Sequence, residues 1–173
     1  MLNFAAYIRN VPDFPVKGIQ FKDITTLIKD GELFAQAVDY LYDPYRHEDI
    51  DKIVAVEARG FIFGAALSYK LNVGFVPIRK PGKLPAETIV EEYELEYGKD
   101  SIEIHKDAIQ KGEKVLFIDD LLATGGTAAA ACRLVEKLGG EIVGCSFLIE
   151  LTELKGRDLL KKYKIHSLIS FPY

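Results

Sequence analysis

Two adjacent carboxylates and a loop of small, hydroxyl-bearing residues follow one another in this 173-residue chain. Asp119 and Asp120 end an apolar run that begins at Val115, and the loop after them is Ala123-Thr124-Gly125-Gly126-Thr127. Hydroxyl groups and free backbone N–H groups bind phosphate, and glycines let phosphate oxygens approach the backbone closely. Adjacent carboxylates repel phosphate but accept hydrogen bonds from vicinal hydroxyls. The stretch therefore predicts a site for a ribose 5-phosphate.

The elements around this stretch support that interpretation. The run from Val115 to Ile118 has no polar alternation, which is typical of a strand buried on both faces of a parallel sheet. The segment 127–138 is a strong helix former that ends at Gly139-Gly140. The loop 123–127 thus lies at a helix N-terminus, where the helix dipole favours an anion. In open parallel sheets, ligands bind at this carboxyl edge.

Two common phosphate motifs do not fit the loop. No lysine follows the glycines as in a Walker A loop, and the spacing is not G-x-G-x-x-G. NTP hydrolysis and NAD binding are therefore disfavoured. A strand, loop and helix with ordinary surface acids is the structural alternative.

The run Asp119 to Thr127 resembles the binding motif for phosphoribosyl pyrophosphate (PRPP) in type I phosphoribosyltransferases. Three further regions strengthen the resemblance: Val11 to Ile24, Glu57 to Phe61, and Arg79 to Pro85 followed by Leu95-Glu96-Tyr97-Gly98. Together they are similar to the adenine-specific branch of that family and cover nearly the whole chain. The resemblance implies transfer of ribose 5-phosphate from PRPP to N9 of adenine, giving AMP and pyrophosphate.

The resemblance also implies roles for charged residues. Asp119 and Asp120 would bind the ribose hydroxyls or magnesium-linked waters, and the turn at Ala58 and Arg59 would hold pyrophosphate. Guanidinium suits this task because its planar fork meets two phosphate oxygens. A surface salt bridge is the alternative for Arg59. Arg79 and Lys83 would reach across a homodimer interface to the partner's PRPP, whereas a solvated loop is the plain alternative.

The base pocket is expected in the amino-terminal segment. Phe21 lies in a stretch with few charged groups, where an aromatic ring could stack on a flat heterocycle. A packed core phenylalanine is the alternative. The resemblance implies that the main chain at Gln20 and Lys22 recognises adenine, while Leu151 closes the other face.

Glu96 and Tyr97 are predicted at the tip of a β-hairpin, where a glutamate is most simply solvent-exposed. By resemblance, both lie on a flexible flap that closes over the substrates. Glu96 then becomes a candidate general acid or base that manages a proton at N7 while N9 attacks.

The alternation of strands and helices predicts an α/β fold with a mostly parallel central sheet flanked by helices, the type I phosphoribosyltransferase fold. We expect a single domain over 1–173, with a hood at 1–30 and a flap at 86–105. Helices are predicted at 2–9, 31–42, 61–71, 127–138 and 153–162. Strands are predicted at 53–56, 73–78, 115–118, 141–149 and 165–169, with hairpin strands at 88–95 and 101–105.

Composition limits the function classes. The net charge of −4 provides no basic surface for nucleic acid, and no apolar run reaches the length of a membrane span. Cys132 and Cys145 are expected to be buried thiols of a cytoplasmic protein. The three histidines are scattered, so Mg²⁺ is expected to arrive with PRPP and no protein metal site is predicted. Two alternatives stay open: a phosphoribosyltransferase for another base, and a PRPP-binding regulator without catalytic activity.

Overall fold

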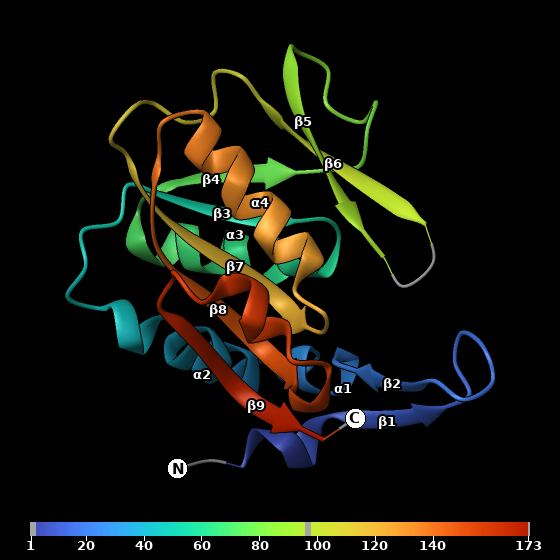
Figure 1. Ribbon diagram of the computed structural model, residues 1–173. Coiled ribbons are helices and arrows are strands. Elements are labelled where there is room, and N and C mark those ends of the chain that lie inside the picture. Colours follow the sequence, from blue (N-terminus) through green and yellow to red (C-terminus); the bar gives the residue numbers. More distant parts are fainter. Residues whose placement is uncertain (1–2, 96–97, 173) are drawn as a thin grey trace.

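The computed structural model describes residues 3–95 and 98–172, and its centre is a sheet of five parallel strands (Figure 1). The strand order is β4-β3-β7-β8-β9. The strands are β3 (Lys52–Val56), β4 (Gly74–Ile78), β7 (Lys114–Leu122), β8 (Glu141–Leu151) and β9 (Ile165–Phe171). Their apolar runs are buried because helices cover both faces, as expected for a parallel sheet. The predicted sheet is confirmed.

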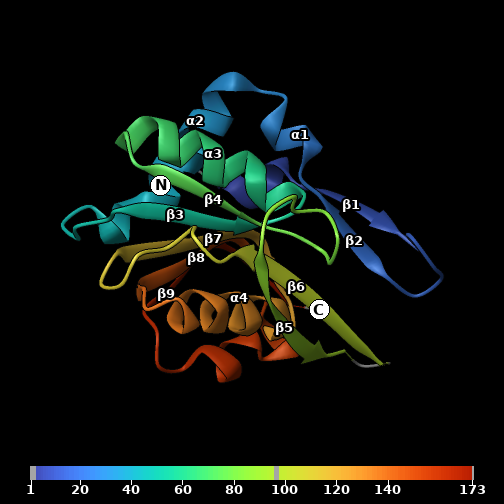
Figure 2. The same cartoon turned by 90° about the horizontal axis from the view of Figure 1, so that it is seen from above.

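Helices cover the two faces of the sheet unequally (Figure 2). α1 (Thr25–Ile28), α2 (Gly31–Tyr42) and α3 (Arg59–Leu71) lie on one face, and α4 (Gly126–Lys137) lies on the other. The start of α2 is set locally, since the Asp30 carboxylate accepts hydrogen bonds from the N–H groups of Glu32 and Leu33 at 3.0 Å. The predicted helix 31–42 is therefore confirmed to the residue.

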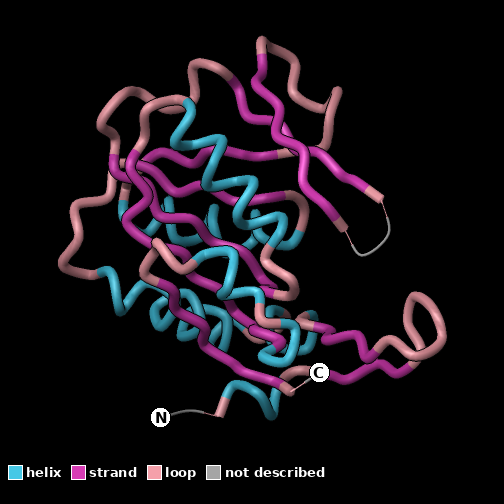
Figure 3. Tube along the Cα trace, in the orientation of Figure 1, coloured by secondary structure: helices cyan, strands magenta, loops and turns pink. Residues whose placement is uncertain are grey.

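Two antiparallel hairpins stand outside the sheet, on the side toward which its strands point (Figures 1 and 3). One consists of β1 (Arg9–Pro12) and β2 (Gln20–Asp23), and the other of β5 (Thr88–Glu94) and β6 (Lys99–His105). The second hairpin packs its inner face on α4 through the fully buried Ile102 and Ile104. The hairpin predicted at 88–105 is thus present.

Two predicted helices are wrong. The segment 153–162 forms two short 3₁₀ helices, Thr152–Leu154 and Gly156–Leu160, because Lys155 adopts a left-handed φ of 53° between them. Of the amino-terminal residues described, from Asn3 on, only Phe4–Tyr7 is helical, again as a 3₁₀ turn, and Arg9 already belongs to β1. In these two segments, 3₁₀ helices and, at the amino terminus, strand pairing replace the predicted helices. A further 3₁₀ turn, Asp43–Tyr45, follows α2.

β7 also differs from its prediction, because it continues through both acids to Leu122. Its pairing with β3 stops at Ile118, opposite Ala55, whereas its pairing with β8 continues to Leu122. Asp119 and Asp120 therefore lie in strand backbone that has a neighbour on one side only. The free side faces the start of α3, which follows β3.

Within the described ranges, no helix is long and apolar enough to cross a bilayer. Cys132 and Cys145 are both free and fully buried, as predicted, and their Sγ atoms are 3.6 Å apart.

Candidate active site

A cavity of about 280 Å³ lies where β3 and β7 end and α3 and α4 begin. It brings together most of the predicted phosphate and ribose residues. Its lining comes from the turn after β3, the end of β7, the loop before α4, and two residues near the second hairpin: Val56, Glu57, Ala58, Arg59, Lys80, Tyr93, Asp119, Asp120, Leu121, Leu122, Ala123, Thr124, Gly125, Gly126, Thr127 and Ala128.

The loop Ala123–Thr127 forms one wall of this cavity. Gly125 precedes α4 with a φ of 85°, a left-handed conformation that glycine adopts at little cost. A Cβ on Gly125 would lie 2.4 Å from the carbonyl oxygen of Gly156, so the loop packs directly on the 3₁₀ helix Gly156–Leu160. The first N–H groups of α4 have no partner within the helix and are available for an anion.

Asp119 and Asp120 form the adjoining wall. Asp120 is 6 % exposed, and its backbone N–H donates to Asp119 Oδ1 at 2.9 Å. A Cβ on Gly60 would lie 2.6 Å from the same oxygen, so α3 approaches Asp119 more closely than any larger residue would allow. Burial and then the neighbouring Asp120 raise the pKa of Asp119 well above its ordinary value. Burial also raises the pKa of Asp120, with Arg59 opposing it.

Arg59 is the first residue of α3 and lies between the acids and the aromatic ring of Phe21. Its Nε is 2.8 Å from Asp120 Oδ2, and its guanidinium carbon is 5.1 Å from the centre of the Phe21 ring. The Glu57–Ala58 peptide before it is cis. Arg59 is thus placed at the junction of two cavities rather than on the surface.

The second cavity is smaller, about 90 Å³, and is mostly apolar. Arg59, Asp120 and Leu121 border both cavities, so the two are contiguous in the structure. Its other lining residues come from β2 and the end of β8: Ile19, Gln20, Phe21, Lys22, Ile149 and Leu151. All four residues predicted for the base pocket are among them.

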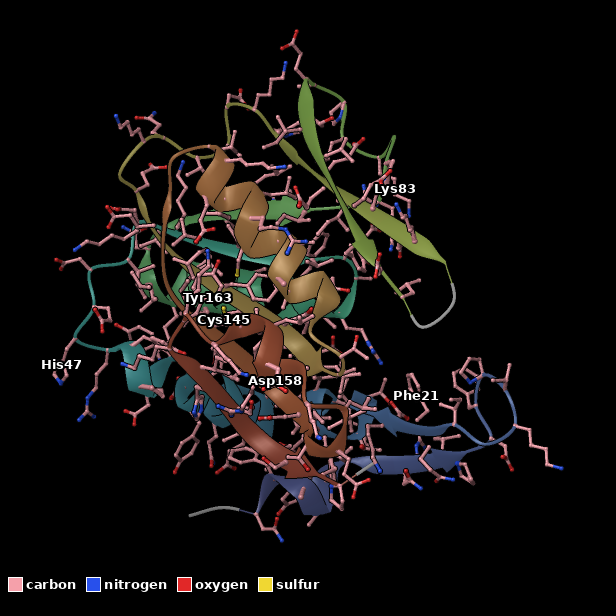
Figure 4. The ribbon with its side chains drawn as sticks, in the orientation of Figure 1. Phe21, His47, Lys83, Cys145, Asp158 and Tyr163 are labelled. Carbon is pink, nitrogen blue, oxygen red and sulfur yellow. The ribbon has the colours of Figure 1, made fainter. Side chains whose placement is uncertain are left out.

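Strand alternation explains how β2 presents itself to this cavity. The side chains of Gln20 and Lys22 turn to Asn10 on β1, with Asn10 Nδ2 donating to Gln20 Oε1 at 2.6 Å and Lys22 Nζ donating to Asn10 Oδ1 at 2.9 Å. Phe21, between them, faces the opposite side and contacts Arg59. In Figure 4, Phe21 lies on β2 at the side of the molecule toward which the sheet strands point.

The cationic loop after β4 is held by Glu57. Arg79 Nη2 and Lys83 Nζ donate to Glu57 Oε2 at 3.3 and 3.1 Å, and the backbone N–H of Lys80 donates to Oε1 at 2.6 Å. Burial acts to raise the pKa of Glu57, but these hydrogen bonds outweigh it and lower that pKa. Glu57 lines the larger cavity, whereas Arg79 and Lys83 are not among its lining residues. Figure 4 shows Lys83 in the loop beside the second hairpin.

Three polar residues of the cavity wall carry no predicted role: Glu57, Lys80 and Tyr93. A signal for the first two was present, because each lies just after a strand of the parallel sheet, at the edge where ligands bind. Tyr93 had no such signal, since its position depends on how the hairpin packs over α4. The predicted flap residues Glu96 and Tyr97 lie outside the described residues.

Two carboxylates of this cavity could contact a metal ion. In the described part of the chain, no three or more His, Cys, Asp or Glu side chains are grouped for a metal ion. Asp119 and Asp120 supply oxygen atoms only, which suits Mg²⁺, an ion that keeps several waters and binds through one or two carboxylates plus phosphates.

Comparison with known proteins agrees with this geometry. The family model of the phosphoribosyl transferase domain matches residues 25–172. An adenine phosphoribosyltransferase of Chloroflexus aurantiacus is 57% identical and covers 98% of both chains. The crystal structure of the enzyme of that name from Thermoanaerobacter pseudethanolicus has 56% identity and a TM-score of 0.94, covering 97% of this chain and 98% of that one. The Saccharomyces cerevisiae protein, solved with adenine and an imino-altritol bisphosphate, has 42% identity and a TM-score of 0.90, covering 95% and 96%.

Proposed function

Because the chain belongs to the phosphoribosyl transferase family, within its adenine phosphoribosyltransferase branch, we propose that it makes AMP and pyrophosphate from adenine and PRPP. It is a transferase that moves a pentosyl group, and the reaction serves purine salvage. One observation carries the proposal: an anion-binding cavity and an apolar slot meet at Arg59, Asp120 and Leu121. The bond between sugar and base would form at this junction.

The larger cavity would hold PRPP. The 5-phosphate would lie against the loop Thr124–Thr127, where the N–H groups that begin α4 and two threonine hydroxyls can donate. The ribose would then face Asp119 and Asp120, in the part of β7 that pairs with β8 but not with β3. As the bond to pyrophosphate breaks, positive charge develops on the sugar, and a fixed carboxylate pair stabilises it without reorganisation.

The smaller cavity would hold adenine between Phe21 and Leu151. Because Asn10 holds the side chains of Gln20 and Lys22, the main chain of β2 is the part left to read the base edge. Adenine offers an amino donor beside a ring acceptor, and hypoxanthine reverses both. A fixed backbone pair would be left unsatisfied by hypoxanthine, which can cost a factor of about 10⁴ in specificity.

The leaving pyrophosphate would be bound by two turns, each of which carries at least one cation. Arg59 and Ala58 belong to the turn after β3, and Arg79, Lys80 and Lys83 belong to the loop after β4. Mg²⁺ would enter bound to PRPP and neutralise part of the pyrophosphate charge. Arg79 and Lys83 would act on the partner's PRPP in a homodimer.

Glu96 and Tyr97, which lie outside the described residues, keep their predicted roles in this proposal. Glu96 would exchange a proton with N7 as N9 attacks. Its test is a pH profile, in which Glu96→Gln should lose one limb of the kcat profile. We also propose a cytoplasmic location, based on the two free, buried thiols.

The test is nucleotide formation, followed by chromatography, with PRPP, magnesium and one base at a time. Adenine should give AMP, while hypoxanthine, guanine, xanthine and orotate should give no product above background. Product from another base would preserve the phosphate site but refute the base pocket. PRPP binding without product from any base would instead favour the regulator.

A further inference from the structure

On the inner face of the β5–β6 hairpin, the side chains of β6 change from apolar to polar toward the tip. Ile102 and Ile104, on this face, are fully buried over α4. One step nearer the tip, Tyr93 and Asp100 are opposite each other in the strand register. Cross-strand partners share a face, so both side chains point the same way. Tyr93 is 8 % exposed and lines the cavity.

Lys80 meets this polar pair from a different part of the chain. Its ammonium forms an ion pair with Asp100 Oδ2 and donates to the Tyr93 hydroxyl at 3.3 Å. The Tyr93 hydroxyl donates to the same Asp100 oxygen at 3.0 Å. The Lys80 hydrogen bond, the largest cause, lowers the pKa of Asp100 despite partial burial. A cation that lines the anion cavity is therefore already paired with a carboxylate of the hairpin.

This arrangement has an electrostatic consequence for any anion that enters. Pyrophosphate must share Lys80 with Asp100 or displace Asp100 from it. The side chains of Lys80 and Asp100 are 40 % and 31 % exposed, so solvent screens the pair in part. A partly screened pair of this kind changes an affinity by a small factor only, about two- to fivefold.

We propose that Asp100 is an internal competitor of pyrophosphate for Lys80, which weakens the retention of pyrophosphate and links its departure to the β5–β6 hairpin. The inference rests on the proposed function for its role in turnover. Asp100 is then a positioning residue that acts through Lys80. The Tyr93 hydroxyl, which forms hydrogen bonds with both side chains, holds them together.

The experiment measures binding of pyrophosphate, with magnesium present, by isothermal titration calorimetry. Asp100→Asn should bind pyrophosphate about two- to fivefold more tightly than the unchanged protein. Glu92→Gln is the matched control, because it removes one carboxylate from the outer face of the same hairpin, where the side chain is 70 % exposed. It should leave the affinity within experimental error.

A double-mutant cycle with Lys80→Met identifies the route of the effect. With Lys80 removed, Asp100→Asn should change pyrophosphate affinity no more than Glu92→Gln does. A tightening that persists without Lys80, an equal tightening by Glu92→Gln, or weaker binding by Asp100→Asn would each overturn the proposal. Asp100→Ser is the second variant if Asp100→Asn does not fold.

Failure of this inference is distinguishable from failure of the proposed function. If the unchanged protein binds pyrophosphate but makes no nucleotide from any base, only the function is refuted. If it makes AMP but the cycle shows no coupling, only the role of Asp100 is refuted. If it binds no pyrophosphate yet makes AMP, only the role of Asp100 is refuted, and if it neither binds pyrophosphate nor makes nucleotide, both are refuted.

Discussion

At the scale of single residues, the site contains two largely buried acids, and burial of a charged carboxylate does not stabilise the fold. Asp119 and Asp120 follow one another in a strand, and burial raises the pKa of both. A carboxyl group whose pKa is raised by folding contributes stability at low pH and loses it as the pH rises. At neutral pH these acids therefore oppose folding, which is a common property of functional sites.

Asp119→Asn should stabilise the protein and abolish most of its turnover. The amide keeps an oxygen for the N–H of Asp120 but carries no charge. At pH 7 we expect a gain of about 1–3 kcal/mol in the free energy of unfolding, or roughly 2–12 °C in Tm. Below the ordinary aspartate range, near pH 3, Asp119 is protonated and the difference should vanish.

Thermal unfolding at pH 3 to 7, together with AMP formation, checks this expectation. Asp49→Asn is the control, since the Asp49 side chain is 93 % exposed, and it should change neither quantity. Equal Tm values for Asp119→Asn and the unchanged protein at pH 7 would contradict the argument from burial.

At the scale of elements, the loop Ala123–Thr127 is positioned by a segment that is distant from it in the chain. The 3₁₀ helix Gly156–Leu160 packs on the loop, and a Cβ on Gly156 would lie 2.3 Å from the carbonyl oxygen of Ala123. Arg157 holds this helix by donating to both carboxylate oxygens of Glu150, at the end of β8. The loop is therefore in contact with a helix whose residues line neither of the two cavities.

Gly156→Ala should weaken PRPP binding without changing the chemistry of the acids. The new methyl group meets backbone, so the loop has to move, and we expect KM for PRPP to rise about tenfold or more with a smaller change in KM for adenine. Steady-state kinetics with each substrate varied checks this. Gly31→Ala is the control because a Cβ there meets nothing within 4 Å. An unchanged KM for PRPP would show that the loop is not positioned in this way.

At the scale of the whole molecule, one chain does not bring all of the cations of the loop after β4 into its own cavity. Arg79 and Lys83 pair with Glu57 of their own chain and stand outside the cavity lining. If they act on the partner's PRPP, as proposed, each active site of a homodimer is built from two chains. That arrangement can be tested by mixing subunits.

Lys83→Met and Asp120→Asn proteins should each be nearly inactive, yet regain activity when unfolded and refolded together. A mixed dimer would contain one complete site, with Asp120 from one chain and Lys83 from the other. Random mixing should restore about a quarter of the sites, because half of the dimers are mixed and each has one complete site. AMP formation by the mixture measures this. No recovery in a dimer that does assemble would place Lys83 in the site of its own chain.

Local signals explain what could be predicted from the sequence alone. The apolar run before Asp119, the glycines before α4 and the Asp30 cap act over a few residues, so the sheet, helix α2 and the loop before α4 were all predictable. The resemblance of the motifs to a known family supplied the reaction. Even locally the prediction failed at 153–162, where a left-handed Lys155 interrupts a helical pattern.

Contacts between distant segments were decided only by the tertiary structure. The pairing of Arg59 with Asp120, of Glu57 with the loop after β4, and of Lys80 with Asp100 all join elements separated in the chain. Each pairing depends on the order of the strands and on how far one strand extends beyond its neighbour. Neither of these properties produces a periodic pattern in the sequence. The sequence by itself therefore determined which residues could bind a ribose phosphate and a base. The packing of the sheet, the helices and the two hairpins decided which charges face one another around the cavity, because charge pairing depends on distance in space and not on distance along the chain.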